Sequence, residues 1–169
     1  MSKCHDDPEL NTSTTFMKAG TNCAVVLEKL GRRDEAIALL EELKAKFGSE
    51  VRLSNNLGII QKRRGDVEAA IRSYRDAIEL DETSFYPNYN LAVVLADQAK
   101  FQEAILYFRN SLTIAEAVTE FDSHKTNILL NLSVCYESLK QLGRAVDSLE
   151  KAHKLEPTNK DIHSKYMSL

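Results

Sequence analysis

The sequence predicts an all-α protein in which four antiparallel helix pairs are stacked one after another as a solenoid. Two observations predict this fold: a residue pattern that recurs every 34 positions, and apolar residues at helical spacing within each copy. The chain of 169 residues contains only 6 Gly and 3 Pro. A β-sandwich or barrel would need more turn residues than that.

The repeat is visible in one short segment of each copy. Residues 31–37, 65–71 and 99–105 all end in Ala-Ile, and each segment begins 34 residues after the previous one. Residues 140–146 end in Ala-Val and begin 41 residues after the third segment. In this register the repeats span 17–50, 51–84, 85–118 and 126–159, with an insert at 119–125.

Small residues recur where the two helices of each repeat are expected to cross. Two antiparallel helices approach closely only if one of the side chains at the crossing is small. The eighth position of each repeat is small, the twentieth is always Ala, and the seventh and twenty-fourth are mostly bulky. From the first repeat to the fourth, the seventh position is Cys23, Leu57, Leu91 and Leu132, the eighth is Ala24, Gly58, Ala92 and Ser133, the twentieth is Ala36, Ala70, Ala104 and Ala145, and the twenty-fourth is Leu40, Tyr74, Phe108 and Leu149.

The other elements follow from the ends of the repeats. Residues 1–16 are polar and are predicted to form a flexible N-terminal arm. In the second repeat, Gly65 is expected to end the first helix and Asp66 to cap the second. Helical spacing continues into residues 119–125, so we expect the second helix of the third repeat to extend through them. Residues 160–169 are predicted to form a partial capping helix, unless the chain was cut here from a longer protein.

The repeat resembles the tetratricopeptide repeat, and the resemblance covers residues 17–159. The motif residues of the second repeat are Leu57, Gly58, Ala70, Tyr74 and Ala77. Pro157 supplies the closing Pro in the fourth repeat only, the chain has no Trp, and Cys23 stands where the motif has Leu. The resemblance implies a right-handed superhelical solenoid whose first helices line a concave groove.

Composition argues against several classes of protein. The 22 Lys and Arg against 25 Asp and Glu give a net charge of −3, which argues against a nucleic-acid partner held by a basic field. No apolar run approaches ~18 residues, so no membrane insertion is predicted, and without an apolar signal segment we expect a cytoplasmic protein. Cys4, Cys23 and Cys135 are too widely spaced for a disulfide framework; the last two are predicted to be small core residues.

The sequence carries no catalytic motif. It has neither a Gly-x-Ser-x-Gly nucleophile segment nor a Gly-rich phosphate loop. Cys4 and His5 have no second pair at zinc-binding spacing. We therefore expect no enzymatic activity, no cofactor and no metal.

The sixth position of every repeat is Asn, and packing does not explain it. Asn is a middling helix former that gains nothing in mid-helix, but its amide offers both a donor and an acceptor to the backbone of an extended peptide. On first helices that line a groove, Asn22, Asn56, Asn90 and Asn131 would form a ladder. This is similar to the asparagine ladder of O-linked N-acetylglucosamine transferases, which holds substrate polypeptide.

Neighbouring positions complete the predicted peptide site with an apolar strip, a basic end and an aromatic middle. The predicted peptide-binding residues beside the Asn column are Arg52, Asn55, Ile59, Tyr86, Tyr89 and Val93. The sequence therefore predicts a non-catalytic scaffold or adaptor whose partner is a protein or a peptide.

Two other functions stay open at this point. The chain could be a substrate-docking or regulatory segment of a larger enzyme. It could also be a homotypic assembly module, with Phe85, Tyr86 and Tyr89 as an adhesive surface that makes homo-oligomers. A carboxylate clamp for chaperone C-termini is disfavoured, because the first repeat offers Thr21 and Val25 where that clamp needs Lys and Asn.

Overall fold

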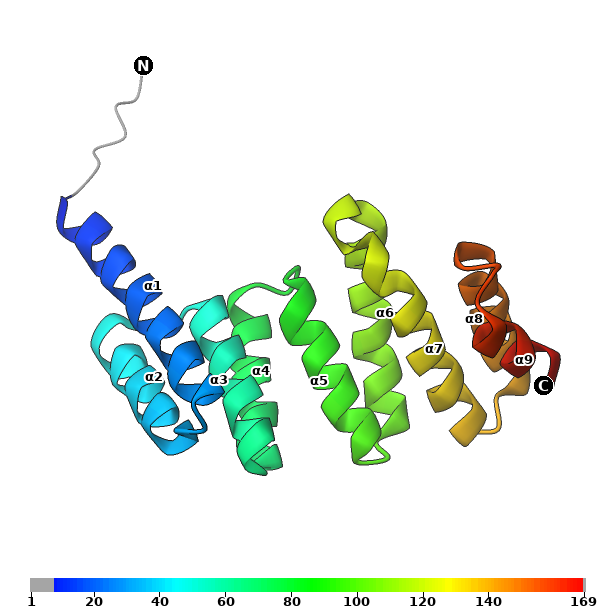
Figure 1. The fold of residues 1–169 in the computed structure, drawn as a ribbon, viewed down its shortest axis with the longest axis horizontal. Coiled ribbons are helices and arrows are strands. Elements are labelled where there is room, and N and C mark those ends of the chain that lie inside the picture. The colour runs from blue at the N-terminus through cyan, green and yellow to red at the C-terminus, as the bar shows by residue number, and fades with distance from the viewer. Residues whose placement is uncertain (1–7, 169) are drawn as a thin grey trace, which may run out of the picture. The chain divides into compact units, whose positions relative to one another are not determined.

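The computed structural model describes residues 8–168, with side chains from Thr14 onward, and all its regular elements are helices (Figure 1). The elements are α1 (Pro8–Lys29), α2 (Arg33–Phe47), α3 (Val51–Arg64), α4 (Val67–Leu80), α5 (Phe85–Asp97), α6 (Phe101–Ala117), the short 3-10 helix η1 (Thr119–Phe121), α7 (Asp122–Ser138), α8 (Leu142–Leu155) and α9 (Lys160–Ser168). The predicted fold of antiparallel helix pairs is confirmed.

The helices form two compact units, with the boundary between Asp81 and Glu82. In the first unit α1 pairs with α2 and α3 with α4, and α2 also packs on α3. In the second unit α5 pairs with α6 and α7 with α8, while α6 packs on α7 and α9 packs on α8. Each unit therefore contains two of the predicted repeats.

The small residues lie where the repeat pattern places them. All four alanines of the twentieth position are fully buried, as are Ala24 and Ala92 at the eighth. The crossing at Gly58 is close, because a Cβ atom there would lie only 2.6 Å from Cε1 of the buried Tyr74. In the first unit the crossing of α1 with α2 joins buried residues of α3 in one apolar cluster.

The same left-handed turn joins the two helices of every repeat. The fifteenth residue of each repeat lies in this turn and has a positive φ: 79° at Gly31, 100° at Gly65, and 57° at both Ala99 and Lys140. In each case the next residue's N–H also reaches back to a carbonyl five residues earlier, as from Asp66 to Gln61 at 2.9 Å. Glycine adopts this conformation without strain, whereas an L side chain does not.

Asp66 does not cap α4 as expected. Its side chain makes no capping hydrogen bond to the start of that helix, and its carboxylate instead accepts a hydrogen bond from Arg64. The Asp66 N–H already donates to the Gln61 carbonyl in the left-handed turn. The Arg64 guanidinium competes for the Asp66 carboxylate oxygen that would otherwise cap the helix.

The ends of the repeat array differ from the prediction in two places. Helix α1 begins at Pro8, so residues 8–16 of the expected arm are helical, and residues 1–7 lie outside the described chain. Pro is well suited to a first helical position, and the Phe16 ring packs 5.6 Å from that of Phe47 on α2. The ring contact holds the part of α1 that precedes the first repeat against α2.

The insert does not extend α6 either. That helix ends at Ala117, Val118 is extended with φ −129° and ψ 111°, and residues 119–121 form η1 before α7 begins at Asp122. The Phe121 ring stacks on Phe85 of α5, with centroids 4.2 Å apart and planes at 11°. The aromatic contact turns the chain back onto its own unit, which residue spacing along a single helix does not reveal.

Helix α9 is present where a partial capping helix was predicted. Its one buried residue, Ile162, packs in a cluster with Leu129 of α7 and Ala152 of α8. Lys165 lies 3.8 Å from the carboxylate of Glu137 on α7. The helix thus covers apolar surface that the fourth helix pair would otherwise leave exposed.

The strained turns predict a stability change of defined sign. Ala99→Gly should raise the free energy of unfolding by about 0.5–1 kcal/mol, because the left-handed conformation costs an L residue about 1–2 kcal/mol and part of this is offset by the greater unfolded-state entropy of Gly. Denaturant unfolding measures the change. Gly65→Ala is the matched reverse variant and should lower stability; equal stability of all three proteins would contradict the strain.

Candidate functional site

The Asn column lies at the border of the buried face of the first helices. Asn22 is exposed, and Asn56, Asn90 and Asn131 are half-buried. The residues that follow the last three, at the seventh position, are buried leucines. The side chains of the column are therefore partly accessible on α1, α3, α5 and α7, and they are not core residues.

In the first unit an ordered contact joins the two first helices. Nη2 of Arg52 on α3 donates a hydrogen bond to Oδ1 of Asn22 on α1, at 2.5 Å. This contact brings two of the predicted site residues together on one side of the unit. Asn55 and Ile59, also on α3, are half-buried.

In the second unit the predicted aromatic residues divide between surface and interior. Tyr86 is 48% exposed, whereas Phe85 is only 2% exposed and is enclosed by other rings. Tyr89 is half-buried and stacks on Phe85 with centroids 5.9 Å apart. Phe85 is therefore an anchor for Tyr89 and Phe121, and its predicted role in an adhesive surface is wrong. Val93 is half-buried farther along α5.

In the second repeat of each unit, the seventh-position side chain lies near the second helix of the repeat before it. Leu57 on α3 lines the same cavity as Glu41 and Lys44 of α2, and Leu132 on α7 lines one with Leu112 of α6. Cys23 occupies this position on α1, but no described helix precedes α1, and its side chain is exposed. The prediction that Cys23 is a core residue is wrong for this reason, whereas Cys135 is buried as predicted.

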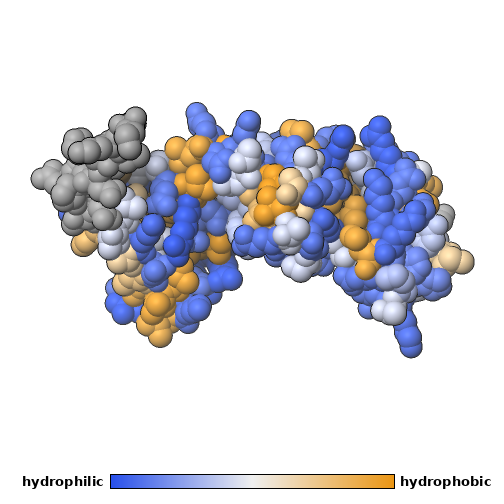
Figure 2. Space-filling model, turned by 90° about the horizontal axis from the view of Figure 1, so that it is seen from above, coloured by the Kyte–Doolittle hydropathy of each residue, from blue (hydrophilic) through white to orange (hydrophobic). Residues whose placement is uncertain are grey.

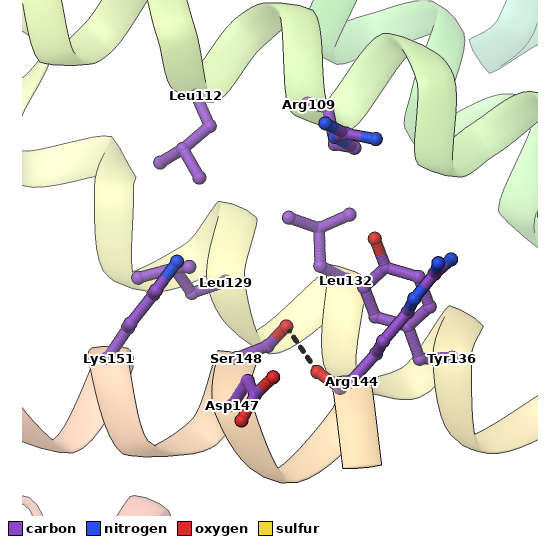
Figure 3. A pocket seen from close by; sticks show the side chains of 9 residues that line it. All are labelled: Arg109, Leu112, Leu129, Leu132, Tyr136, Arg144, Asp147, Ser148 and Lys151. Atoms are coloured by element: carbon purple, nitrogen blue, oxygen red, sulfur yellow. Dashed lines mark hydrogen bonds between the residues drawn. The ribbon is translucent and has the colours of Figure 1, made fainter. Parts of the chain in front are cut away.

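A second type of surface feature was not predicted: a groove between consecutive second helices. In the first unit it lies between α2 and α4, over α3, and in the second between α6 and α8, over α7 (Figure 3). Corresponding repeat positions line both grooves. We call them the α2–α4 groove and the α6–α8 groove. Repeat positions 19, 22, 25 and 26 line these grooves. The residues at these positions vary from repeat to repeat, so the repeat pattern alone suggests that they are merely solvent-exposed.

Several charged groups of the structure form ion pairs. Arg63 at the end of α3 lies 2.7 Å from Glu28 of α1, and Arg64 lies 2.9 Å from Asp34. The hydrogen bond from Arg32 holds the pKa of Glu35 below its usual value, and Lys154 does the same to the pKa of Glu150. These shifts come from exposed ion pairs, so they do not indicate an acid–base centre.

The described residues offer neither a metal site nor a membrane-spanning helix. Within residues 8–168 no group of His, Cys, Asp and Glu is arranged to hold a metal ion. None of the helices described there is long and apolar enough to cross a membrane. Figure 2 shows hydrophilic residues over most of the face in view, with hydrophobic residues in separate groups.

Comparison with known proteins identifies the family. Three family profiles match the chain: a tetratricopeptide repeat profile at residues 85–155, a TPR repeat profile at 58–98 and a further tetratricopeptide repeat profile at 21–46. The chain belongs to the tetratricopeptide repeat family, as its repeat pattern predicted.

Individual relatives are distant. Tetratricopeptide repeat protein 1 of Schizosaccharomyces pombe is 27% identical over 101 residues, which are 60% of this chain but only 9% of that protein. Among solved structures, residues 41 to the end of MamA from Desulfovibrio magneticus RS-1 superpose with a TM-score of 0.76 at 19% identity, covering 89% of this chain and 80% of that one. YrrB, described as a TPR protein with an unusual peptide-binding site, gives 0.70 at 21% identity over 93% and 77% of the two chains. These likenesses confirm the helical-repeat solenoid class.

The two described cysteines should differ sharply in reactivity. Burial raises the pKa of the Cys135 thiol from 9.0 to about 11, so at pH 8 it is both enclosed and protonated, whereas Cys23 is exposed. In a Cys4→Ser variant, Ellman's reagent should modify one thiol per chain in buffer and two in guanidinium. Because folding favours the neutral Cys135 thiol, its contribution to stability should also fall as pH rises from 9 toward 11. Rapid modification of both thiols in buffer would contradict this placement.

Proposed function

We propose that the chain is a non-catalytic protein interaction module that holds an extended peptide segment against the first helices of its repeats. The observation that carries the proposal is the Asn column: the sixth position is Asn in all four repeats, its side chain is at least partly exposed in each, and in the last three it precedes a buried leucine. Membership of the tetratricopeptide repeat family supports the interaction role, and the ladder is our extension of it.

The chemistry of the column suits a peptide backbone. An amide can accept from a peptide N–H and donate to a peptide C=O at the same time, which makes recognition tolerant of sequence. In the first unit the oxygen of Asn22 already accepts from Arg52, so the Asn22 amide is oriented before a partner arrives. Ile59 and Val93, one helical turn beyond the column, would offer half-buried apolar contacts to peptide side chains.

The proposed partner is a protein, and the proposed setting is the cytoplasm. A net charge of −3 gives no general attraction to nucleic acid. Of the aromatic residues expected to mediate self-association, only Tyr86 is well exposed, which makes a homotypic assembly the weaker proposal.

Removal of two amides should weaken partner binding without unfolding the chain. We expect Asn56→Ala with Asn90→Ala to lower affinity roughly 5- to 150-fold, since each lost hydrogen bond costs about 0.5–1.5 kcal/mol and the two terms are assumed to add. The melting temperature should hold or rise slightly, because Ala is the better helix former. Partner captured from lysate by the intact chain, then titrated by calorimetry, gives the affinities.

The matched control is Asn110→Ala, which removes an exposed Asn from α6 on the second-helix side. It should leave affinity unchanged. If the double variant instead melts at a lower temperature and binds as well as the parent chain, the column is structural and the ladder is refuted.

A further inference from the structure

The α6–α8 groove is a cavity of about 320 Å³ on the second-helix side of the second unit, away from the Asn column. Figure 3 shows side chains from three helices around it: Arg109 and Leu112 from α6, Leu129, Leu132 and Tyr136 from α7, and Arg144, Asp147, Ser148 and Lys151 from α8. Leu129 and Leu132 are buried beneath the groove, and Leu112 is the half-buried leucine that it leaves partly accessible.

The rim of the groove carries an excess of positive charge. Arg109, Arg144 and Lys151 line it against a single carboxylate, that of Asp147. Arg144 is positioned by its neighbours: its guanidinium lies 5.8 Å from the centre of the Tyr136 ring, and Nη1 donates to Oε1 of Gln141 at 3.1 Å. Among the described residues, no carboxylate lies within ion-pair distance of Arg109 or Lys151.

In the α2–α4 groove, by contrast, an ion pair within the protein bridges the two second helices. There Lys44 of α2 and Asp76 of α4 form an ion pair of 2.6 Å across the groove. The corresponding residues of the second unit are Leu112 and Lys151, which cannot pair.

Two further replacements work in the same direction. Arg109 stands where the first unit has Glu41, and Arg144 stands where it has Ala69. Three cations line each groove, but the second unit has lost the internal bridge and has one carboxylate in place of two. Cations without an internal carboxylate partner, placed around a half-buried leucine, are complementary to a segment that carries carboxylates on either side of an apolar side chain.

We propose that the α6–α8 groove docks an acidic peptide segment of a protein partner, separate from the peptide site on the first helices. The apolar side chain of the segment packs on Leu112, and its flanking carboxylates pair with Arg109, Arg144 and Lys151. Asp147 repels a carboxylate placed beside it, which favours acidic residues at the two ends of the groove over its middle.

The test uses the full chain and a fluorescein-labelled pentapeptide of four glutamates around a central leucine. The control peptide replaces every Glu with Gln. Fluorescence anisotropy at low ionic strength should show the Glu peptide binding on the order of tenfold more tightly than the Gln peptide. Equal binding of the two peptides would overturn the proposal.

Charge-reversal variants then locate the site. Arg109→Glu with Lys151→Glu should reduce affinity for the Glu peptide by at least about tenfold, and both side chains are exposed, so circular dichroism should show an intact fold. Arg72→Glu removes an exposed cation from the α2–α4 groove and should leave affinity unchanged. Equal losses in the two proteins would indicate general charge attraction and overturn the proposal.

A third variant separates this site from the one on the first helices. Asn56→Ala with Asn90→Ala should keep the parent chain's preference for the Glu peptide over the Gln peptide, because amides that bind a peptide backbone do not distinguish these side chains. A loss of that preference would place its origin on the first helices and overturn the proposed groove. Binding to phosphatidylserine vesicles that depends on Arg109 and Lys151, with no binding of the peptide, would overturn it in favour of a lipid surface.

Discussion

The close approach of two helices at a small residue is the constraint on which the rest of the structure depends. Each helix pair brings a small eighth-position residue against its second helix, and Ala at the twentieth position is buried without exception. At Gly58 the space is so limited that even a methyl group would meet the ring of Tyr74. The pair cannot separate without losing this apolar contact, and it cannot rotate without a clash.

The fixed rotation of each pair decides what every other position does. With the eighth position against the partner helix, the seventh position of the second repeat in each unit lies near the second helix of the repeat before it, as Leu57 and Leu132 do. The sixth then falls at the border of the buried face, where an Asn amide is partly accessible. The two binding surfaces proposed for this chain arise in the same way: one carries the sixth position, and the other lies between neighbouring second helices.

The periodic features could be predicted from sequence because they repeat and depend on contacts within a helix pair. The helix pairs, the buried alanines and the buried Cys135 follow from the 34-residue register alone. Features that depend on a helix being first, last or interrupted could not be predicted this way. Cys23 is exposed because α1 has no described predecessor, and the insert folds back because Phe121 meets Phe85. The α6–α8 groove was missed because its cations occupy positions that vary between repeats.

The central claim, that the crossing of small and large residues sets the geometry, is tested most directly by a double-mutant cycle on Gly58 and Tyr74. Gly58→Ala alone should destabilise the chain by about 1–3 kcal/mol, because a buried ring cannot give way. Combined with Tyr74→Leu it should cost little more than Tyr74→Leu alone, since the first repeat already pairs Ala24 with Leu40 in its core. Denaturant unfolding of the four proteins gives the coupling free energy. The predicted result is a coupling clearly different from zero, with Gly58→Ala costing less stability in the Tyr74→Leu background than on its own. Strictly additive changes would contradict the account.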